Sequence, residues 1–247
     1  MMAWLRVFGR FLLFVTYTLW CFLRYFGLRL AGYDKARAAN VIKEAWLRFL
    51  PHRLGLRIHV EGSAQPSPCL YVANHIAYVD PIPLFMHLDA RVVAKAEVRR
   101  WPIIGFAAGI IRTIFVRRDE KNSRHAAAEA IQHALESGIS ILVFPEGTTS
   151  EGNGTLPFRP RSFEAAGKAG VPVQPIAMWY DTPLAAYVGN DTFLPHFFRL
   201  FRLKQFTCFL VFGPALTGPD TTERAQSWID SILKLNHHAH GRSTATT

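Results

Sequence analysis

The first part of the sequence contains a long apolar segment with arginines on both sides. Residues 11–23 read FLLFVTYTLWCFL and carry no charge; the flanking basic residues are Arg6, Arg10, Arg24 and Arg29. A bilayer-spanning helix needs about 20 mostly apolar residues, a length that residues 7–30 reach only with three arginines included. We therefore expect a helix lying in one leaflet of a membrane, with a single span or a buried core helix as alternatives. No small-residue cleavage motif follows, which disfavours a secretory signal.

A second helix is predicted over residues 35–50. Its apolar residues recur at three- and four-residue spacing, which is typical of a helix with one buried face. Gly32 ends the first helix, Asp34 can cap the second, and Pro51 is expected to stop it. Residues 1–52 are thus predicted to form a membrane-associated unit of two helices.

Strands and helices alternate after this unit. Apolar, β-branched runs predict strands at residues 56–62, 69–75, 90–97, 113–118, 140–147, 171–180 and 206–213. Helical spacing predicts helices at residues 81–88, 123–137, 163–168 and 220–235. Continuous apolar strands separated by helices indicate the α/β class, with a single mixed sheet covered by helices. We expect this domain to span residues 53–236, followed by a disordered tail at 237–247.

Composition narrows the class of partner. Half of the residues are hydrophobic, 19% are charged, and the formal net charge is +10. Such an excess attracts nucleic acid or an anionic lipid surface, but the arginines interleave with apolar runs, so we expect membrane lipids and no nucleic acid. The three isolated cysteines favour neither disulfides nor a metal site. They fit a reducing compartment, so we expect the chain on the cytoplasmic face of a membrane.

The segment NHIAYVD places His75 after an apolar strand and Asp80 five residues later. A turn between them would let the carboxylate meet one imidazole nitrogen, while the other accepts a proton from a substrate hydroxyl. Asp80 followed by Pro81 is also a good start for a helix, so a purely structural cap is the alternative. His75 and Asp80 are therefore candidate catalytic groups.

Three further segments carry polar groups near strand ends, where α/β sheets place their sites. KAEVRRWPIIG supplies Lys95, RTIFVRR supplies Arg118, and VFPEGTTS supplies Glu146 followed by Gly147, Thr148 and Thr149. Taken singly, a solvated basic face and an ordinary turn explain them equally well. The motifs GxSxG, GxGxxG and HExxH and the Walker loop do not occur, so direct attack by an activated hydroxyl is the simpler chemistry.

Together these segments resemble the 1-acylglycerol-3-phosphate acyltransferase family, also called the lysophospholipid acyltransferases. NHIAYVD is similar to its first motif and TIFVRR to its second, although Arg112 replaces the usual opening glycine. FPEGTTS is similar to the third motif, VPVQPI to the fourth, and KAEVRRWPIIG to the connecting pattern. The resemblance covers about residues 56–180 in the right order and spacing.

The resemblance implies that His75 is the base, that Asp80 orients it, and that Lys95, Arg118, Glu146, Gly147, Thr148 and Thr149 bind substrate. It also implies an acyl-CoA or acyl carrier protein thioester as donor, and neither a metal nor another cofactor. Thr149 stands where the family usually has an arginine, and a hydroxyl binds a phosphate monoester poorly.

Two acceptors therefore remain open. The first is 1-acylglycerol-3-phosphate, which gives phosphatidic acid in phospholipid biosynthesis, with Arg118 and either Arg159 or Arg161 supplying the charge. The alternative is lyso-ornithine lipid or another lysophospholipid. A second hypothesis of another class is a basic membrane-surface binding protein without catalysis. Lysolipid-dependent thiol release from acyl-CoA would separate the two classes.

Overall fold

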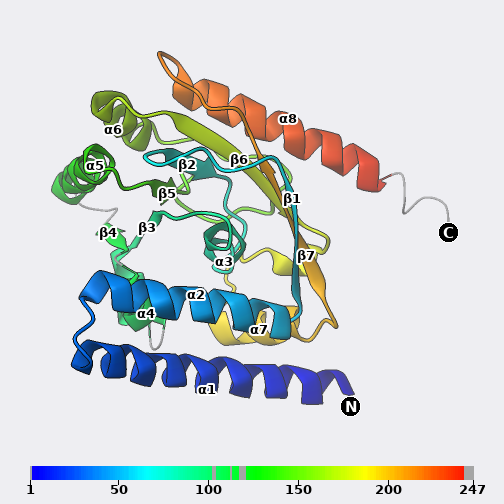
Figure 1. The fold of residues 1–247 in the computed structure, drawn as a ribbon. Helices are drawn as coiled ribbons and strands as arrows, with labels where there is room; N and C mark the ends of the chain where they lie inside the picture. The colour runs from blue at the N-terminus through cyan, green and yellow to red at the C-terminus, as the bar shows by residue number, and fades with distance from the viewer. Residues whose placement is uncertain (1, 102–103, 112, 117–120, 242–247) are drawn as a thin grey trace.

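In the part of the chain that the structure describes, seven strands form one sheet in the order β1-β7-β6-β2-β5-β3-β4 (Figure 1). The structure, a computed structural model, describes residues 2–101, 104–111, 113–116 and 121–241. The strands are β1 (Leu56–Glu61), β2 (Leu70–Ala73), β3 (Arg91–Lys95), β4 (Ile114–Val116), β5 (Ile141–Val143), β6 (Val173–Tyr180) and β7 (Phe206–Phe212). All neighbours pair in parallel except β6 and β7, which are antiparallel. The predicted single mixed sheet is confirmed.

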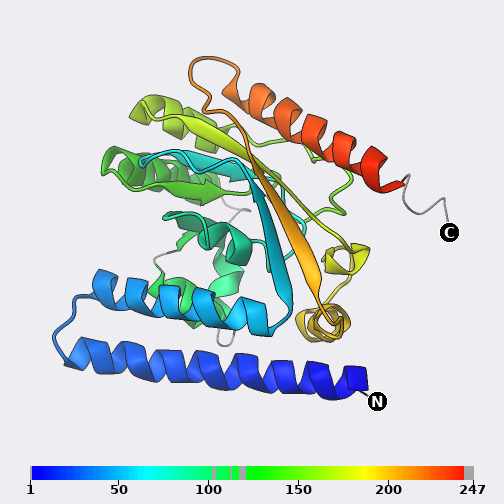
Figure 2. The same ribbon diagram turned by 45° about the vertical axis from the view of Figure 1, so that its right-hand side comes forward.

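Helices cover both faces of the sheet (Figures 1 and 2). One face packs against α5 (Lys121–Glu136), α6 (Arg161–Ala169) and α8 (Thr221–Gly241). The other carries α1 (Met2–Leu30), α2 (Lys35–Arg53), α3 (Pro81–Phe85), α4 (Ile104–Ile110) and α7 (Phe193–Phe201). The described residues also form two short 3₁₀ helices, η1 (Ala96–Arg100) and η2 (Pro183–Ala185). Because both faces are covered, all four residues of β2 and all three of β5 are buried. This explains why those strands read as unbroken apolar runs.

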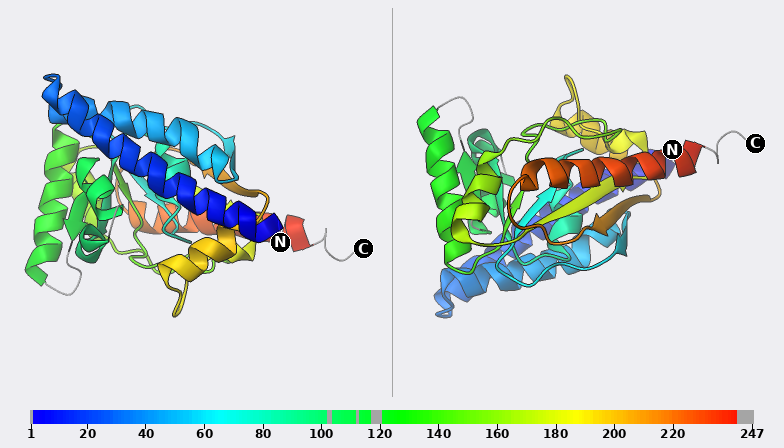
Figure 3. Two further views of the ribbon diagram at one scale, coloured as in Figure 1. Left: turned by 90° about the horizontal axis from the view of Figure 1, so that it is seen from below. Right: turned by 90° about the horizontal axis from the view of Figure 1, so that it is seen from above.

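Helix α1 lies along α2 and reaches α7, on the side of the molecule away from α8 (Figure 3). It is the one helix of the described residues that is long and apolar enough to cross a membrane. Its outward face exposes large apolar side chains: Leu5, Phe8, Leu12, Leu19, Leu23, Phe26 and Leu30. They are spaced three, four or seven residues apart, so they form one stripe along the helix.

Two of the arginines that flank the apolar segment hold α1 against the protein. The Arg10 guanidinium donates to the carbonyl oxygens of Phe201 at 2.9 Å and Lys204 at 2.7 Å, and Arg6 donates to that of Arg202 at 3.1 Å. These carbonyls lie at the carboxyl end of α7, where helical carbonyls lack partners within the helix. Arg6 and Arg10 therefore dock α1 onto α7.

Several elements differ from the sequence predictions, among them α4, which was not predicted. Pro51 does not stop α2, which continues to Arg53, because the N–H of Leu54 still bonds to the Leu50 carbonyl at 3.0 Å. Helix α8 extends to Gly241, five residues into the tail predicted to be disordered. A polar sequence can prolong an existing helix, because adding a residue needs no new nucleation. Residues 242–247 lie outside the described part. Helix α7 was not predicted.

Candidate active site

The carboxyl end of β2 is fixed to β6 by a buried asparagine. The Asn74 side-chain amide donates to the Met178 carbonyl at 2.8 Å, and its oxygen accepts from the Met178 N–H at 2.9 Å. Because both bonds are buried, the residue that follows leaves the sheet in a defined direction. That residue is His75.

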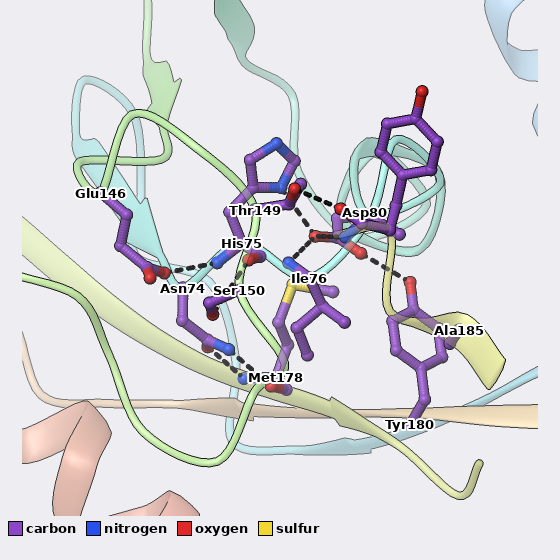
Figure 4. A network of polar contacts seen from close by, with 12 residues as sticks. Asn74, His75, Ile76, Asp80, Glu146, Thr149, Ser150, Met178, Tyr180 and Ala185 are labelled. Atoms are coloured by element: carbon purple, nitrogen blue, oxygen red, sulfur yellow. Dashed lines mark hydrogen bonds and ion pairs between the residues drawn. The ribbon is translucent and has the colours of Figure 1, made fainter. Parts of the chain in front are cut away.

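His75 and Asp80 meet directly (Figure 4). The His75 Nδ1 and the Asp80 Oδ2 are 2.8 Å apart, and Oδ2 also accepts the N–H groups of Ile76 at 2.6 Å and Ala77 at 2.9 Å. Asp80 makes no side-chain capping bond at the start of α3. The predicted contact is therefore present, and the carboxylate folds back onto the histidine instead of capping the helix.

Tyr180 is a third member of this network, and sequence reasoning missed it. Its hydroxyl donates to the other Asp80 oxygen, Oδ1, at 2.9 Å. Burial and the nearby Asp80 charge raise the pKa of Tyr180, so the phenol keeps its proton and stays a donor. Only its place at the carboxyl end of a predicted strand hinted at a role.

These contacts fix the protonation pattern of the imidazole. A carboxylate can only accept, so Nδ1 carries the proton and the lone pair of a neutral ring lies on Nε2. The ring stacks on Phe144 with centroids 4.1 Å apart and an interplanar angle of 17°. In Figure 4 the second ring nitrogen points away from Asp80. His75 is thus arranged as a proton acceptor at Nε2.

Glu146 braces the backbone of this loop. Its carboxylate is buried and accepts the N–H of His75 at 2.7 Å and that of Leu156 at 2.9 Å. Burial raises the pKa of Glu146, and the two backbone donors oppose that rise. The Ser150 N–H donates to the His75 carbonyl oxygen at 2.8 Å. These contacts give Glu146 a positioning role, while its expected contact with an acceptor stays a prediction.

The next residues of the same loop face a cavity. Gly147 has a φ of +77°, a conformation that favours glycine, and a Cβ there would lie 2.8 Å from Cζ of the flexible Arg159 side chain, which would have to shift. The Thr149 hydroxyl donates to the Tyr187 carbonyl. Gly147, Thr148 and Thr149 line the same cavity as His75, and their predicted contacts with substrate stay predictions.

Two predicted cations lie partly or wholly outside the described residues. Lys95 is the last residue of β3, paired through its backbone with Val116, but its side chain falls outside the described part. Arg118 and Arg112 also lie outside it. The predicted substrate contacts of Lys95 and Arg118 therefore stay predictions.

The cavity has a volume of about 640 Å³ and runs from the histidine to the amino-terminal helices. This size is typical of sites for small organic ligands. We call the lining residues from the loops after β2 and β5 and before α7 its polar end: His75, Tyr78, Gly147, Thr148, Thr149 and Asp191. Its apolar wall includes Phe14, Cys21 and Phe22 from α1 and Ile42, Trp46 and Leu47 from α2. Within the described ranges, no cluster of His, Cys, Asp and Glu could hold a metal ion.

Comparison with known proteins finds one consistent group. Residues 56–179 match the family described as Acyltransferase. A lyso-ornithine lipid O-acyltransferase of Pseudomonas aeruginosa is 37% identical over 180 residues, which cover 70% of this chain and 69% of that protein. A 1-acyl-sn-glycerol-3-phosphate acyltransferase of Neisseria gonorrhoeae is 29% identical over 202 residues, 77% of each chain.

A solved structure has the same fold. The 1-acyl-sn-glycerophosphate acyltransferase PlsC of Thermotoga maritima matches with a TM-score of 0.67, over 97% of this chain and 95% of that one. The identity is 20%, so this similarity concerns the fold alone. The match nevertheless includes both the helices at the start of the chain and the sheet.

Proposed function

This chain belongs to the acyltransferase family, and we propose that it moves a fatty acyl group from a thioester carrier to the free hydroxyl of a lysolipid. One observation carries the proposal: His75, held by Asp80, lines a cavity whose lining is mostly apolar. A general base beside a lipid-sized cavity is what acylation of a lipid hydroxyl requires.

The proposed reaction needs only acid–base chemistry at the histidine. Nε2 of His75 takes the proton as the acceptor oxygen attacks the thioester carbonyl, so a C–O bond forms and the C–S bond breaks. The leaving thiolate then recovers the proton from the imidazolium. Asp80 holds Nδ1 and balances the positive charge in between. Acyl-CoA or acyl carrier protein supplies the activated acyl group, so we expect no further cofactor.

We assign the apolar part of the cavity to the acyl chain. Its wall is made by α1 and α2 on one side and by Val92 and Phe85 on the other. Burying a CH₂ group contributes about 0.8 kcal/mol, so such a wall favours long chains. The transferred carbonyl would then lie beside His75 while the tail points towards the membrane side of the molecule.

Membrane association follows from α1 and from the family, and we propose that α1 lies along the cytoplasmic surface of a bilayer. Its apolar stripe faces outward, while its inner face packs on α2 and α7. Exposed basic residues flank the stripe: Arg24, Lys35, Arg37, Arg202 and Lys204. A helix docked along its length and bordered by cations fits the interface of an anionic membrane.

Two acceptors fit this site. The first expectation, 1-acylglycerol-3-phosphate, needs a cation for its phosphate, and Arg159 beside Gly147 is a described candidate. The alternative, lyso-ornithine lipid, is supported by the names of relatives such as the one from Pseudomonas aeruginosa. Either acceptor presents a free hydroxyl to the same base, so the proposed chemistry does not depend on the head group.

The proposal is tested by replacing the base. In purified His75→Ala in detergent, lysolipid-dependent thiol release from acyl-CoA should fall about 10²–10⁴-fold, because general base catalysis contributes a factor of that size. His59→Ala is the matched control, since this histidine is exposed on β1 beside Glu61. Full acylation by a folded His75→Ala protein would exclude the proposed mechanism.

A further inference from the structure

The loop between η2 and α7, which the sequence did not single out, forms part of the polar end of the cavity. Tyr187, Val188, Gly189 and Asp191 all line it. The loop is tied to the site twice: the Tyr187 N–H donates to the Ile76 carbonyl at 3.0 Å, and the Tyr187 carbonyl accepts from Thr149. Ile76 follows His75 in the sequence, and Thr149 lines the same cavity as His75. The loop is thus held at a fixed place beside the reacting atoms.

Asp191 brings a negative charge into this wall. Its carboxylate oxygens accept from Nη1 and Nη2 of Arg199 on α7 at 3.0 and 2.6 Å. The two bonds from Arg199 lower the pKa of Asp191, so it is ionised at neutral pH. Asp191 is the one carboxylate among the cavity-lining residues that the structure describes. Lys43, which lines the cavity from α2, pairs with Asp89 at 3.1 Å.

We propose that Asp191 is a subsite for a positively charged amino group on the acceptor head group. The preferred acceptor is then a lysolipid with an amino-acid head group that bears an ammonium, such as lyso-ornithine lipid. This inference rests on the proposed acyl transfer and specifies its acceptor. Arg199 is a positioning residue here, because its two donors fix the orientation of the carboxylate.

The reach of the subsite fits a head group. Asp191 lies four residues after Tyr187, so their Cα atoms are at most about 14 Å apart. The N–H of Asp191 also bonds to the Val188 carbonyl at 3.2 Å, which closes a turn and shortens that span. Because the Tyr187 N–H bonds to the carbonyl of Ile76, next to His75, a lipid whose hydroxyl is at His75 would extend its head group past Tyr187 to meet the carboxylate.

The same wall disfavours a phosphate monoester. Arg199 offsets the charge of Asp191, but the carboxylate oxygens keep lone pairs that can accept an ammonium N–H, whereas an ionised phosphate offers them only acceptors. Thr149 adds to this, because it occupies the position of the usual arginine and uses its hydroxyl to hold the loop that carries Asp191. The two features act together: one removes a phosphate-binding side chain, and the other places a cation-binding side chain nearby.

The test compares two lipids and two proteins. Wild type and Asp191→Asn are assayed with lyso-ornithine lipid and with the same lipid acetylated on its side-chain amine, which removes the ammonium. A hydrogen bond to a charged group is equivalent to about tenfold to a hundredfold in binding. Wild type should therefore lose at least about tenfold in kcat/KM on acetylation, whereas Asp191→Asn should use both lipids equally poorly.

Asp181→Asn is the matched control. Asp181 also accepts a backbone N–H, that of Thr207 at 2.8 Å, but it does not line the cavity. This variant should discriminate between the two lipids as wild type does. A wild type that ignores acetylation, or an Asp191→Asn protein that still discriminates, overturns the inference. The acetylation arm uses wild type alone, so it decides even if Asp191→Asn does not fold.

Lysophosphatidate as a third acceptor distinguishes failure of the Asp191 subsite from failure of the proposed acyl transfer. Acylation of lysophosphatidate in preference to the amino lipid would overturn the Asp191 subsite and leave the proposed acyltransferase function standing. Failure of wild type to acylate any of the three, with intact acyl-CoA and acyl carrier protein as donors, would overturn the proposed function itself.

Discussion

Removing the Tyr180 hydroxyl tests whether the buried carboxylate must be held on both sides. Oδ2 of Asp80 accepts from His75, Ile76 and Ala77, whereas Oδ1 accepts from Tyr180 at 2.9 Å. Tyr180→Phe keeps the ring in place and deletes that one donor. The carboxylate must then leave Oδ1 unpaired in a buried site or rotate away from the imidazole.

The magnitude follows from the type of bond. A hydrogen bond to a charged group contributes about 1.5–3 kcal/mol, so the free energy of unfolding should fall by about 2 kcal/mol. If about 1.4 kcal/mol of this holds Asp80 against the histidine, kcat should fall about tenfold. Tyr180 does not line the cavity, so KM for the acceptor should stay within about twofold.

Tyr71→Phe is the control. The Tyr71 hydroxyl is also tied down, donating to the Gln65 carbonyl at 2.6 Å, but Gln65 does not belong to the His75 network. Both variants should lower the thermal unfolding midpoint in detergent, and only Tyr180→Phe should lower kcat. A low-field proton resonance from His75 Nδ1–H, present in wild type, should shift in Tyr180→Phe alone. Wild-type kcat and an unshifted resonance in a destabilised Tyr180→Phe protein would refute the positioning role.

Three further predictions concern the loop, the pH dependence and the membrane face. Glu146→Gln should destabilise the protein by about 1–3 kcal/mol and lower kcat, because an amide can accept from only one of the two backbone N–H groups that the carboxylate pairs; unchanged unfolding and kcat would contradict this. Burial and then Arg199 lower the pKa of His196 below its usual 6.5, so stability is full above about pH 6.5 and is lost as pH falls. The wild-type unfolding midpoint should therefore drop more between pH 7.5 and 5.5 than that of His196→Gln; equal drops would show that another group is responsible. Replacing the exposed Leu12 and Leu23 on α1 with Asn should reduce flotation with anionic vesicles about tenfold or more. The reason is that burying a leucine contributes about 1.5–3 kcal/mol. The control Leu235→Asn, on the opposite side of the molecule in α8, should float as wild type does.

The sequence predicts that the loops after β2 and β5 lie close together, because the carboxyl ends of parallel strands meet at the same edge of a sheet. Buried strands read as unbroken apolar runs, so β2 and β5 and the polar residues after them could be recognised locally. These strands are neighbours in the sheet. His75 and Glu146 were therefore expected at one edge before their contact was known.

Long-range partners escape this reasoning. Tyr180 reaches Asp80 across 100 residues, and the contact depends on β6 lying beside β2, which no local pattern reveals. Helix α7 has only nine residues and contains a proline near its start, so it was not recognised in the sequence, although its buried residues lie on one face. Its role as a platform for Arg10 and Arg199 appears only when distant segments are placed together.

Thr149 shows how the two kinds of information combine. The sequence indicates that an arginine is missing from its usual position, and from that alone the acceptor could still carry a phosphate bound by another cation. The structure gives the hydroxyl a partner, the Tyr187 carbonyl, and so connects the substitution to the loop that presents Asp191. The replacement of the usual arginine by Thr149 removes a cationic binding group, and it is thereby linked to the placement of an anionic one, the carboxylate of Asp191. If head-group preference evolves by such linked changes, restoring Arg at position 149 alone should not confer efficient use of lysophosphatidate, because the carboxylate of Asp191 would still face the phosphate.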